Sequence, residues 1–200
     1  MIDSWEIAGH TLEYLDEPHL YLVDGVTVPS VSSCLSARFP HKYAAVDGAI
    51  LNRAAERGTE THKAIEEWCK TGAESDLPEL RNFKFLKKQF GFEVLDNEVP
   101  VIIFDDDVPV MAGRLDMVIR IGDEWGIADI KRTSSLDKEW LAYQLNLYRI
   151  GYRQSYGIEA EFLRGIHLRD DVRKFVTIPI REEKTLELLH EFLKGEQENE

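Results

Sequence analysis

Hydrophobic and polar residues alternate along two short runs near the middle of the chain, from Arg114 to Ile121 and from Glu124 to Lys131. Alternation with a period of two is typical of strands that bury one face. The two residues between the runs, Gly122 and Asp123, suit a type II′ turn, which favours glycine at its first position. The pattern therefore predicts an antiparallel hairpin.

The short turn determines which residues of the two predicted strands face one another. Counting back from a two-residue loop places Asp116 directly opposite Asp129. Because side chains alternate between the faces of a strand, Lys131 shares the face of these two acids. Val118 and Ile127 are expected beside the acids, and Leu115, Met117, Ala128 and Ile130 are expected in a core on the other face.

Two carboxylates that face each other across a sheet repel, and the repulsion costs stability. A divalent cation removes that cost, because carboxylate oxygens are good ligands for hard ions. Lys131 is placed to orient or deprotonate a water molecule, or to contact a phosphate oxygen. The hairpin thus predicts a metal-assisted site with Asp116, Asp129 and Lys131 as catalytic residues. A surface hairpin with solvated charges is the alternative.

Residues 46–70 show apolar or small residues at spacings of three and four, which predicts a helix with one buried face. A second line of residues, each one turn apart, runs through Gly58, His62 and Glu66. Glycine costs a helix about 1 kcal/mol relative to alanine, so Gly58 indicates the close approach of another group. His62 is a candidate ligand beside that gap, with a satisfied structural histidine as the alternative. The buried stripe is Leu51, Ala54, Gly58, Thr61, Ile65 and Trp68.

A helix predicted over 137–157 carries two apolar stripes with a polar residue between them. Gln144 lies in this arc, and Tyr148 follows one turn later. A glutamine among apolar residues costs stability unless its amide is hydrogen-bonded. The position indicates either a functional contact or a buried structural glutamine. The stripes are Leu136, Trp140, Tyr143, Leu147 and Ile150, and Leu141, Leu145, Tyr148 and Tyr152.

The remaining patterns complete one α/β domain with a central mixed sheet flanked by helices. Small antiparallel strands are expected within 10–28, further strands at 93–104, 160–168 and 174–180, and helices at 79–90 and 182–194. No repeat or linker divides the 200 residues. Residues 1–200 are therefore predicted to form a single domain, with 1–40 as an N-terminal β-hairpin extension and 195–200 as a frayed tail.

The composition indicates the cellular compartment and limits the expected partners. The two cysteines, Cys34 and Cys69, allow neither a disulfide framework nor a four-cysteine cluster, so a reducing, cytoplasmic setting is expected. The first ten residues lack the features of a signal peptide, and no apolar run is long enough to span a membrane, so no membrane partner is expected.

The net charge of −13 argues against a nucleic-acid partner, but the acids are concentrated at the two ends of the chain. Residues 1–40 carry one base and six acids, and residues 181–200 carry three bases and seven acids. The middle of the chain is therefore nearly balanced and can still supply a basic groove. Its candidate residues are Arg53, Arg57, Lys63, Arg114, Lys131, Arg132, Lys138, Arg149 and Arg153.

Four short motifs occur in the order found in RecB-type nucleases, and the chain resembles that branch of the PD-(D/E)xK nuclease superfamily, together with its phage exonuclease-like members. The motifs are GxxxH at 58–62, GRLD at 113–116, DIK at 129–131 and QxxxY at 144–148. The string YLVDGVTVPSVSSCL at 21–35 resembles the N-terminal segment of the phage-type members. The resemblance spans roughly residues 51–156 and implies a restriction-endonuclease-like core.

The resemblance also implies roles for individual side chains. The implied ligands of Mg²⁺ or Mn²⁺ are His62, Asp116, Asp129 and the carbonyl of Ile130, with Lys131 assisting the activated water. The implied accessory residues are Glu66, which would orient the imidazole of His62, and Glu98, a further carboxylate on the preceding strand. The implied DNA-binding residues are Gln144, Tyr148, Arg114 and Arg132. The cysteines that hold an iron–sulfur cluster in some relatives are absent, which excludes that cluster.

These roles predict a metal-dependent DNA nuclease that hydrolyses phosphodiester bonds, with an exonuclease acting on duplex ends in recombination or repair as the favoured form. A structure-selective or single-strand endonuclease is one alternative. A non-catalytic acidic binding subunit with the same fold is another. DNA is the expected partner, a single-strand annealing protein is a candidate second partner, and the oligomeric state is left open.

Overall fold

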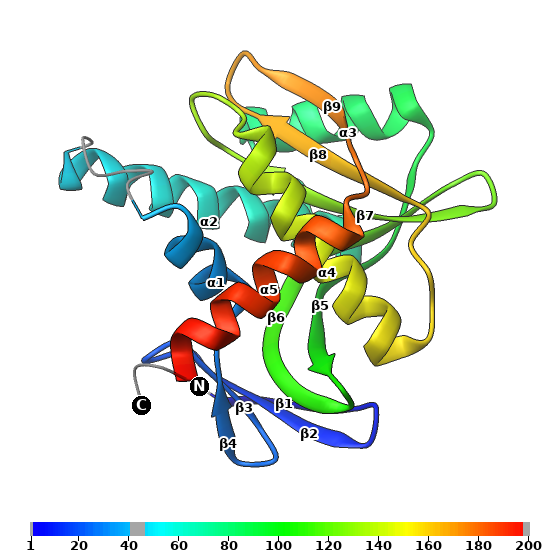
Figure 1. Ribbon diagram of the computed structural model, residues 1–200. Coiled ribbons are helices and arrows are strands. Elements are labelled where there is room, and N and C mark those ends of the chain that lie inside the picture. Colours follow the sequence, from blue (N-terminus) through cyan, green and yellow to red (C-terminus); the bar gives the residue numbers. More distant parts are fainter. Residues whose placement is uncertain (1, 41–46, 198–200) are drawn as a thin grey trace.

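The fold, a computed structural model, describes residues 2–40 and 47–197 and contains two β-sheets (Figure 1). The larger sheet has five strands in the order β5-β6-β7-β8-β9. They are β5 (Glu93–Asp105), β6 (Val108–Ile121), β7 (Glu124–Lys131), β8 (Phe162–Leu168) and β9 (Arg173–Ile178). Only β7 and β8 are parallel, and helix α4 (Lys138–Tyr156) makes the crossover between them. The sheet is therefore mixed, as the sequence predicts.

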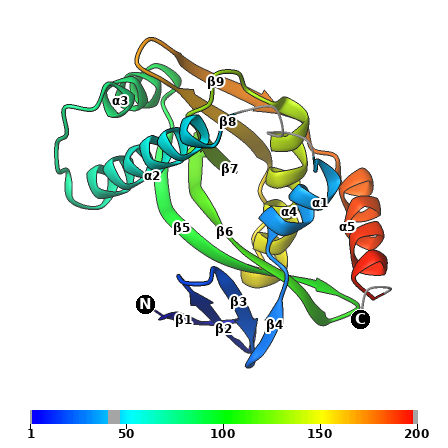
Figure 2. The ribbon, with the colours of Figure 1, turned by 90° about the vertical axis from the view of Figure 1, so that its left-hand side faces the viewer.

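Helices cover both faces of this sheet (Figure 2). One face packs against α1 (Val31–Arg38), α4 and α5 (Glu182–Gln197), and the other packs against α2 (Gly48–Thr71) and α3 (Pro78–Phe90). The predicted α/β architecture is confirmed. Residue 46, where the helix over 46–70 was expected to begin, lies outside the described residues. Helix α2 begins directly after Asp47, whose carboxylate caps its N-terminus.

The hairpin of β6 and β7 has the predicted register. Its pairs run from Ile121↔Glu124 to Met117↔Ala128, and Gly122 has a φ of +60°, which suits a glycine in the turn. The predicted sorting of side chains into cores is only partly correct. Met117, Ala128 and Ile130 pack together as expected, but Leu115 packs on the opposite face with Val118 and Ile127.

An interruption of the strand at Asp116 explains this difference. Asp116 has no ladder partner on β5 or β7 among the described residues. The regular alternation is broken there, so Leu115 and Met117, on either side of Asp116, point to opposite faces of the sheet. Glu98, which the register of β5 places across from Asp116, has a φ of +54°. A left-handed backbone at a non-glycine residue in a strand is strained and often marks a functional position.

The N-terminal sheet is larger than the predicted hairpin. It comprises β1 (Ile2–Ile7), β2 (His10–Leu15), β3 (Leu20–Val23) and β4 (Val26–Val28), paired antiparallel in that order. The extra strand, β1, was not predicted. The N-terminal sheet contacts the larger sheet where the backbone amide of Ala112 donates to the carbonyl oxygen of Pro29 at 3.0 Å. A small core is buried between the two sheets. That core contains Ile7, Leu12, Val23, Val28, Ile102 and Ala112.

The C-terminal helix extends beyond its predicted end. Residues 195–197, expected to be frayed, continue α5, and residues 198–200 lie outside the described part of the chain. Glutamate and glutamine after Gly195 favour helix, so a single glycine does not end it. Within residues 2–40 and 47–197, none of the helices combines the length and the apolar character that crossing a membrane requires.

Candidate metal centre

An open cleft of about 570 Å³ lies beside β5 and β6, with one wall formed by α2. The cleft is lined by Gly58, Thr59, His62, Lys63, Glu66, Glu98 and Arg114. A Cβ atom added at Gly58 would meet no atom within 4 Å, so the space above this glycine is open in the cleft. Among the described residues, no group makes the predicted close approach to Gly58, which faces the open cleft instead.

Three side chains with metal-ligating atoms converge in this cleft. One ligand atom from each of His62, Glu98 and Asp116 lies within 4.8 Å of the others. They come from α2, β5 and β6, so the site forms only when the helix docks on the sheet. His62 Nδ1 lies 3.6 Å from Asp116 Oδ2. The sequence predicted His62 and Asp116 as neighbours, and the structure brings them together.

The backbone of Ile130 links the two sides of this group. His62 Nε2 lies 3.0 Å from the carbonyl oxygen of Ile130, and a carbonyl only accepts, so Nε2 is the donor. The amide of Ile130 donates in turn to Asp116 Oδ2 at 2.7 Å. The predicted carbonyl ligand therefore lies against the predicted imidazole ligand, and the neighbouring peptide group orients Asp116.

Asp129 is closer to Lys131 than to the three converging residues. Lys131 Nζ lies 2.6 Å from Asp129 Oδ2, although neither oxygen of Asp129 accepts a well-directed hydrogen bond among the described residues. Asp129 is 1% exposed. Burial, and secondly the Asp116 carboxylate, raise the pKa of Asp129 to about 6, against the opposing effect of Lys131.

The β6–β7 ladder explains why Asp129 does not join the tightest group. Its last pair is Met117↔Ala128, so the strands separate before Asp116 and Asp129 can pair. Among the residues that the structure describes, the tightest group of ligating side chains is His62, Asp116 and Glu98, and Asp129, predicted as a ligand with His62, Asp116 and the Ile130 carbonyl, lies outside it. The charge of Asp116 nevertheless contributes to the raised pKa of Asp129.

Glu98, expected only as an accessory carboxylate, lines the cleft and belongs to the converging group. Burial, and secondly the charge of Asp116, raise the pKa of Glu98 to about 7, and Arg114 opposes this shift. Arg114 Nε lies 2.8 Å from Glu98 Oε2, and its Nη1 lies 3.6 Å from Asp3 Oδ2 of the N-terminal sheet. The guanidinium also lies over the ring of Tyr14, 5.3 Å from its centroid. Arg114 therefore lines the cleft, as a DNA-binding role needs, but it is held by protein groups.

Glu66 does not make its predicted contact. In the described residues its carboxylate pairs with Lys70 at 2.6 Å, while the two nitrogens of His62 face Ile130 and Asp116. The one-turn spacing places Glu66 on the cleft wall with His62. The carboxylate of Glu66, however, pairs with Lys70, four residues and about one turn further along α2.

Gln144 and Tyr148 lie behind the site rather than on its surface. Tyr148 is 5% exposed, and burial raises its pKa well above the ordinary value. A Cβ added at Gly113 would come within 2.8 Å of Tyr148, so the glycine of the GRLD motif permits this ring to pack on β6. Gln144 Oε1 is buried and accepts no hydrogen bond from the described residues.

No pattern in the sequence points to His167, which the structure places beside Lys131. The parallel pairing of β7 and β8 makes Lys131 and His167 direct neighbours. His167 is buried, its Nε2 lies 2.7 Å from the carbonyl of Thr133, and its Nδ1 has no hydrogen-bond partner in the described residues. The imidazole thus holds the loop that follows Lys131. Only the strand order, which is not local in sequence, reveals this contact.

Arg149 and Arg153, two candidates for the predicted basic groove, pair with acidic residues. Arg149 pairs with Glu159 and Glu182, and Arg153 pairs with Glu182 at 2.7 Å. These contacts fasten α4 to the start of α5. Arg132, predicted to bind DNA, pairs with the fully buried Glu79 at 2.5 Å.

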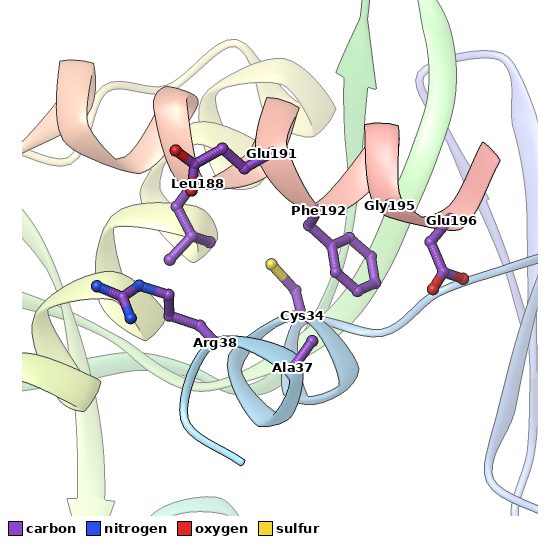
Figure 3. Close-up of a pocket in the computed structure, with 8 residues that line it drawn as sticks. All are labelled: Cys34, Ala37, Arg38, Leu188, Glu191, Phe192, Gly195 and Glu196. Atoms are coloured by element: carbon purple, nitrogen blue, oxygen red, sulfur yellow. The ribbon is translucent and has the colours of Figure 1, made fainter. Parts of the chain in front are cut away.

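A second pocket, of about 300 Å³, lies between α1 and α5 (Figure 3). Cys34 from α1 points toward Leu188 and Phe192 of α5, with Arg38, Glu191 and Glu196 at the rim. Burial raises the pKa of the Cys34 thiol to about 12, so the thiol stays protonated and is a poor nucleophile near neutral pH. This pocket therefore offers no chemistry comparable with that of the acidic cleft.

Comparison with known proteins adds little to this geometry. No protein-family model matches the chain, and no curated protein matches its sequence. One solved structure, described as "Crystal structure of SSO0001", matches with a TM-score of 0.48 and 18% sequence identity. The match covers 84% of this chain and 75% of that one. Similarity at this level carries no argument about function, so the function must be argued from the site.

Proposed function

We propose that the protein is a metal-dependent DNA nuclease that hydrolyses phosphodiester bonds. The observation that carries the proposal is the convergence of His62, Glu98 and Asp116 in one open cleft, with the Asp129–Lys131 pair on the adjoining strand. One imidazole and several carboxylates are a donor set for Mg²⁺ or Mn²⁺, and the imidazole favours Mn²⁺. The four-motif resemblance supplies the substrate class.

The residues present fit such an ion. His62 Nε2 donates to the Ile130 carbonyl, which leaves Nδ1, 3.6 Å from Asp116 Oδ2, as the imidazole nitrogen that can bind a metal. One ligand atom from each of His62, Glu98 and Asp116 lies within 4.8 Å of the others. Asp129 Oδ2 pairs with Lys131, but the buried Oδ1 accepts no hydrogen bond from the described residues, which is a further sign of a partner that is not a protein group. His62, Glu98, Asp116 and the Ile130 carbonyl would hold the ion, with Asp129 beside it.

A bound divalent ion supplies Lewis-acid stabilisation of the phosphate and a water of lowered pKa. The chain's own residues do the rest. Lys131 Nζ, held by Asp129, donates to the attacking water or to a phosphate oxygen. Asp116 is positioned by the Ile130 amide, which donates to its Oδ2 at 2.7 Å. Arg114 lines the same cleft and is the nearest cation to Glu98, where a phosphate can compete for it.

A preference for duplex ends rests on the resemblance to phage-type exonucleases, and it is part of the same proposal. Digestion of linear duplex, covalently closed circular duplex and single-stranded DNA, each with Mg²⁺ or Mn²⁺, tests it. An exonuclease degrades the linear duplex and spares the closed circle. An endonuclease also cuts the circle or the single strand, and a binding subunit retains DNA without cutting it.

The matched variants for this digestion are Asp116→Asn in the cleft and Asp123→Asn in the exposed hairpin turn, which remove the same charge. We expect Asp116→Asn to abolish cutting and Asp123→Asn to leave it unchanged. A wild-type protein that cuts none of the three substrates with either metal refutes the nuclease proposal.

A further inference from the structure

Two arginines meet on the α2 side of the sheet, where β7 ends. Arg57 comes from α2, one residue before the glycine that lines the cleft, and Arg132 directly follows Lys131. We propose that Arg57 and Arg132 together bind a backbone phosphate of the DNA strand, next to the phosphate that lies at the metal centre. This inference deepens the proposed nuclease function and rests on it.

Contacts to a buried acid fix the two guanidinium groups. Arg132 Nε lies 2.5 Å from Glu79 Oε1, and Arg57 Nη2 lies 3.6 Å from the same oxygen. Glu79, on α3, is fully buried, whereas Arg57 is 44% exposed. A buried carboxylate that contacts both arginines holds their planar groups in place before a ligand arrives. Such preorganisation reduces the conformational entropy that is lost when a ligand binds.

An exposed carboxylate already occupies the position that an anion would take. Asp170, in the turn between β8 and β9, places Oδ1 3.6 Å from Arg57 Nη2 and 3.5 Å from Arg132 Nη2. Asp170 is 68% exposed, and exposed ion pairs of this length contribute little to stability. A phosphate carries more oxygens than a carboxylate and suits two guanidinium forks better. The carboxylate of Asp170 therefore stands in for a phosphate that can displace it.

The position relative to the metal centre suits successive phosphates of one strand. Arg132 is two residues beyond Ile130, which is about 6.6 Å along an extended chain. Arg57 is five residues before His62, which is about 7.5 Å along a helix. Each backbone offset is comparable with one nucleotide step, and the two guanidinium groups contact the same two acids, so the arginine pair forms one anion site next to the candidate metal ligands.

The charge balance makes the proposal specific. Arg57 and Arg132 are balanced by Glu79 and Asp170, and Glu60, 3.8 Å from Arg57 Nε, adds a further acid, so the cluster is no general basic patch. Displacement of Asp170 removes the one acid that contacts both guanidinium groups from the exposed side. Removal of the Asp170 charge should therefore strengthen DNA binding, although an acid-to-amide change elsewhere on the surface has no such effect.

The test measures the dissociation constant of an end-labelled linear duplex over a range of salt concentrations. The variants are Arg57→Ala and Asp170→Asn, each in a Lys131→Ala background so that the DNA stays intact. The matched controls are Arg81→Ala on α3 and Asp171→Asn in the same turn, both at exposed positions. Arg132 is left unchanged, because its removal would leave Glu79 buried without its closest partner.

We expect Arg57→Ala to weaken binding about tenfold or more, as for loss of a hydrogen bond to a charged group. It should also lower the slope of log affinity against log salt by about one. Asp170→Asn should bind more tightly than its background, and both controls should match the background. The proposal is overturned if Arg57→Ala behaves like Arg81→Ala, or if Asp170→Asn binds no more tightly than Asp171→Asn.

A second arm separates this inference from the nuclease proposal. Inorganic phosphate, without metal or DNA, should raise the melting temperature of Asp170→Asn more than that of Asp171→Asn, and Arg57→Ala should abolish the rise. If the wild type neither binds nor cuts DNA, the nuclease proposal fails while this arm still reports on the arginine pair. If phosphate stabilises Arg57→Ala and Arg81→Ala equally, the two arginines do not form the site.

Discussion

Removal of the Asp116 charge should stabilise the protein when no divalent ion is present. Asp116 is the strongest neighbouring charge that raises the pKa of both Glu98 and Asp129. Two unit charges 4.8 Å apart, the outer limit for Glu98 and Asp116, repel by about 3 kcal/mol at an effective dielectric constant near 20. Arg114, Lys131 and the partial exposure of the site reduce this, so we expect Asp116→Asn to gain about 1–2 kcal/mol.

The gain should depend on pH in a defined direction. The pKa values of Glu98 and Asp129 are raised in the folded protein, to about 7 and about 6, so the folded state binds protons more tightly than the unfolded chain. The stability that these two groups contribute is therefore present in full below their ordinary values, near pH 4, and is lost as the pH rises through 7. Asp116→Asn should lose less stability over this window than the wild type.

The assay is thermal unfolding in EDTA at pH 5 and pH 8, with Asp123→Asn as the matched control. For a chain of this length, about 1 kcal/mol corresponds to about 2–4 °C in melting temperature. Asp116→Asn should melt several degrees above the wild type at pH 8 and close to it at pH 5, since the neighbouring acids are then protonated. A variant that is no more stable than wild type at pH 8, or equally improved at both pH values, refutes the repulsion argument.

Three further substitutions separate the roles assigned around the cleft. Lys131→Ala should abolish cleavage yet keep the Mn²⁺-dependent rise in melting temperature, because Lys131 is not a ligand; loss of that rise would show otherwise. Gln144→Ala should lower cleavage and DNA affinity with Mn²⁺ binding nearly intact in calorimetry, whereas wild-type values of all three would make the residue structural. His167→Leu should lower kcat with little change in KM, and His167→Gln, which can still donate to the Thr133 carbonyl, should restore much of it. Equal losses in both variants would exclude this positioning role.

Local patterns were sufficient to predict the hairpin, since two alternating runs and a Gly-Asp turn fix its register without help from the rest of the fold. The helical line through His62 was equally visible in the sequence. The same patterns could not show that His62 reaches the Ile130 carbonyl, because this contact depends on how α2 docks on the sheet. The family resemblance supplied that expectation.

The features that sequence patterns missed are breaks in regularity or contacts between distant strands. Glu98 joins His62 and Asp116 where its own backbone is left-handed and the opposite strand is unpaired at Asp116. No periodic pattern predicts such a break. His167 adjoins Lys131 only through the parallel pairing of β7 and β8. Arg132 has the charge of a DNA-binding residue, but the buried acid that holds it lies on α3, far away in sequence.

The central claim is that one set of residues, His62, Glu98 and Asp116, holds the ion that DNA cleavage requires. The most direct measurement titrates Mn²⁺ into the wild type and into Asp116→Asn by calorimetry, and follows cleavage of linear duplex over the same concentrations. We expect wild-type binding and cleavage to saturate together, and Asp116→Asn to lose both. Cleavage that persists in EDTA, or an Asp116→Asn protein that binds Mn²⁺ as tightly as the wild type, would contradict it.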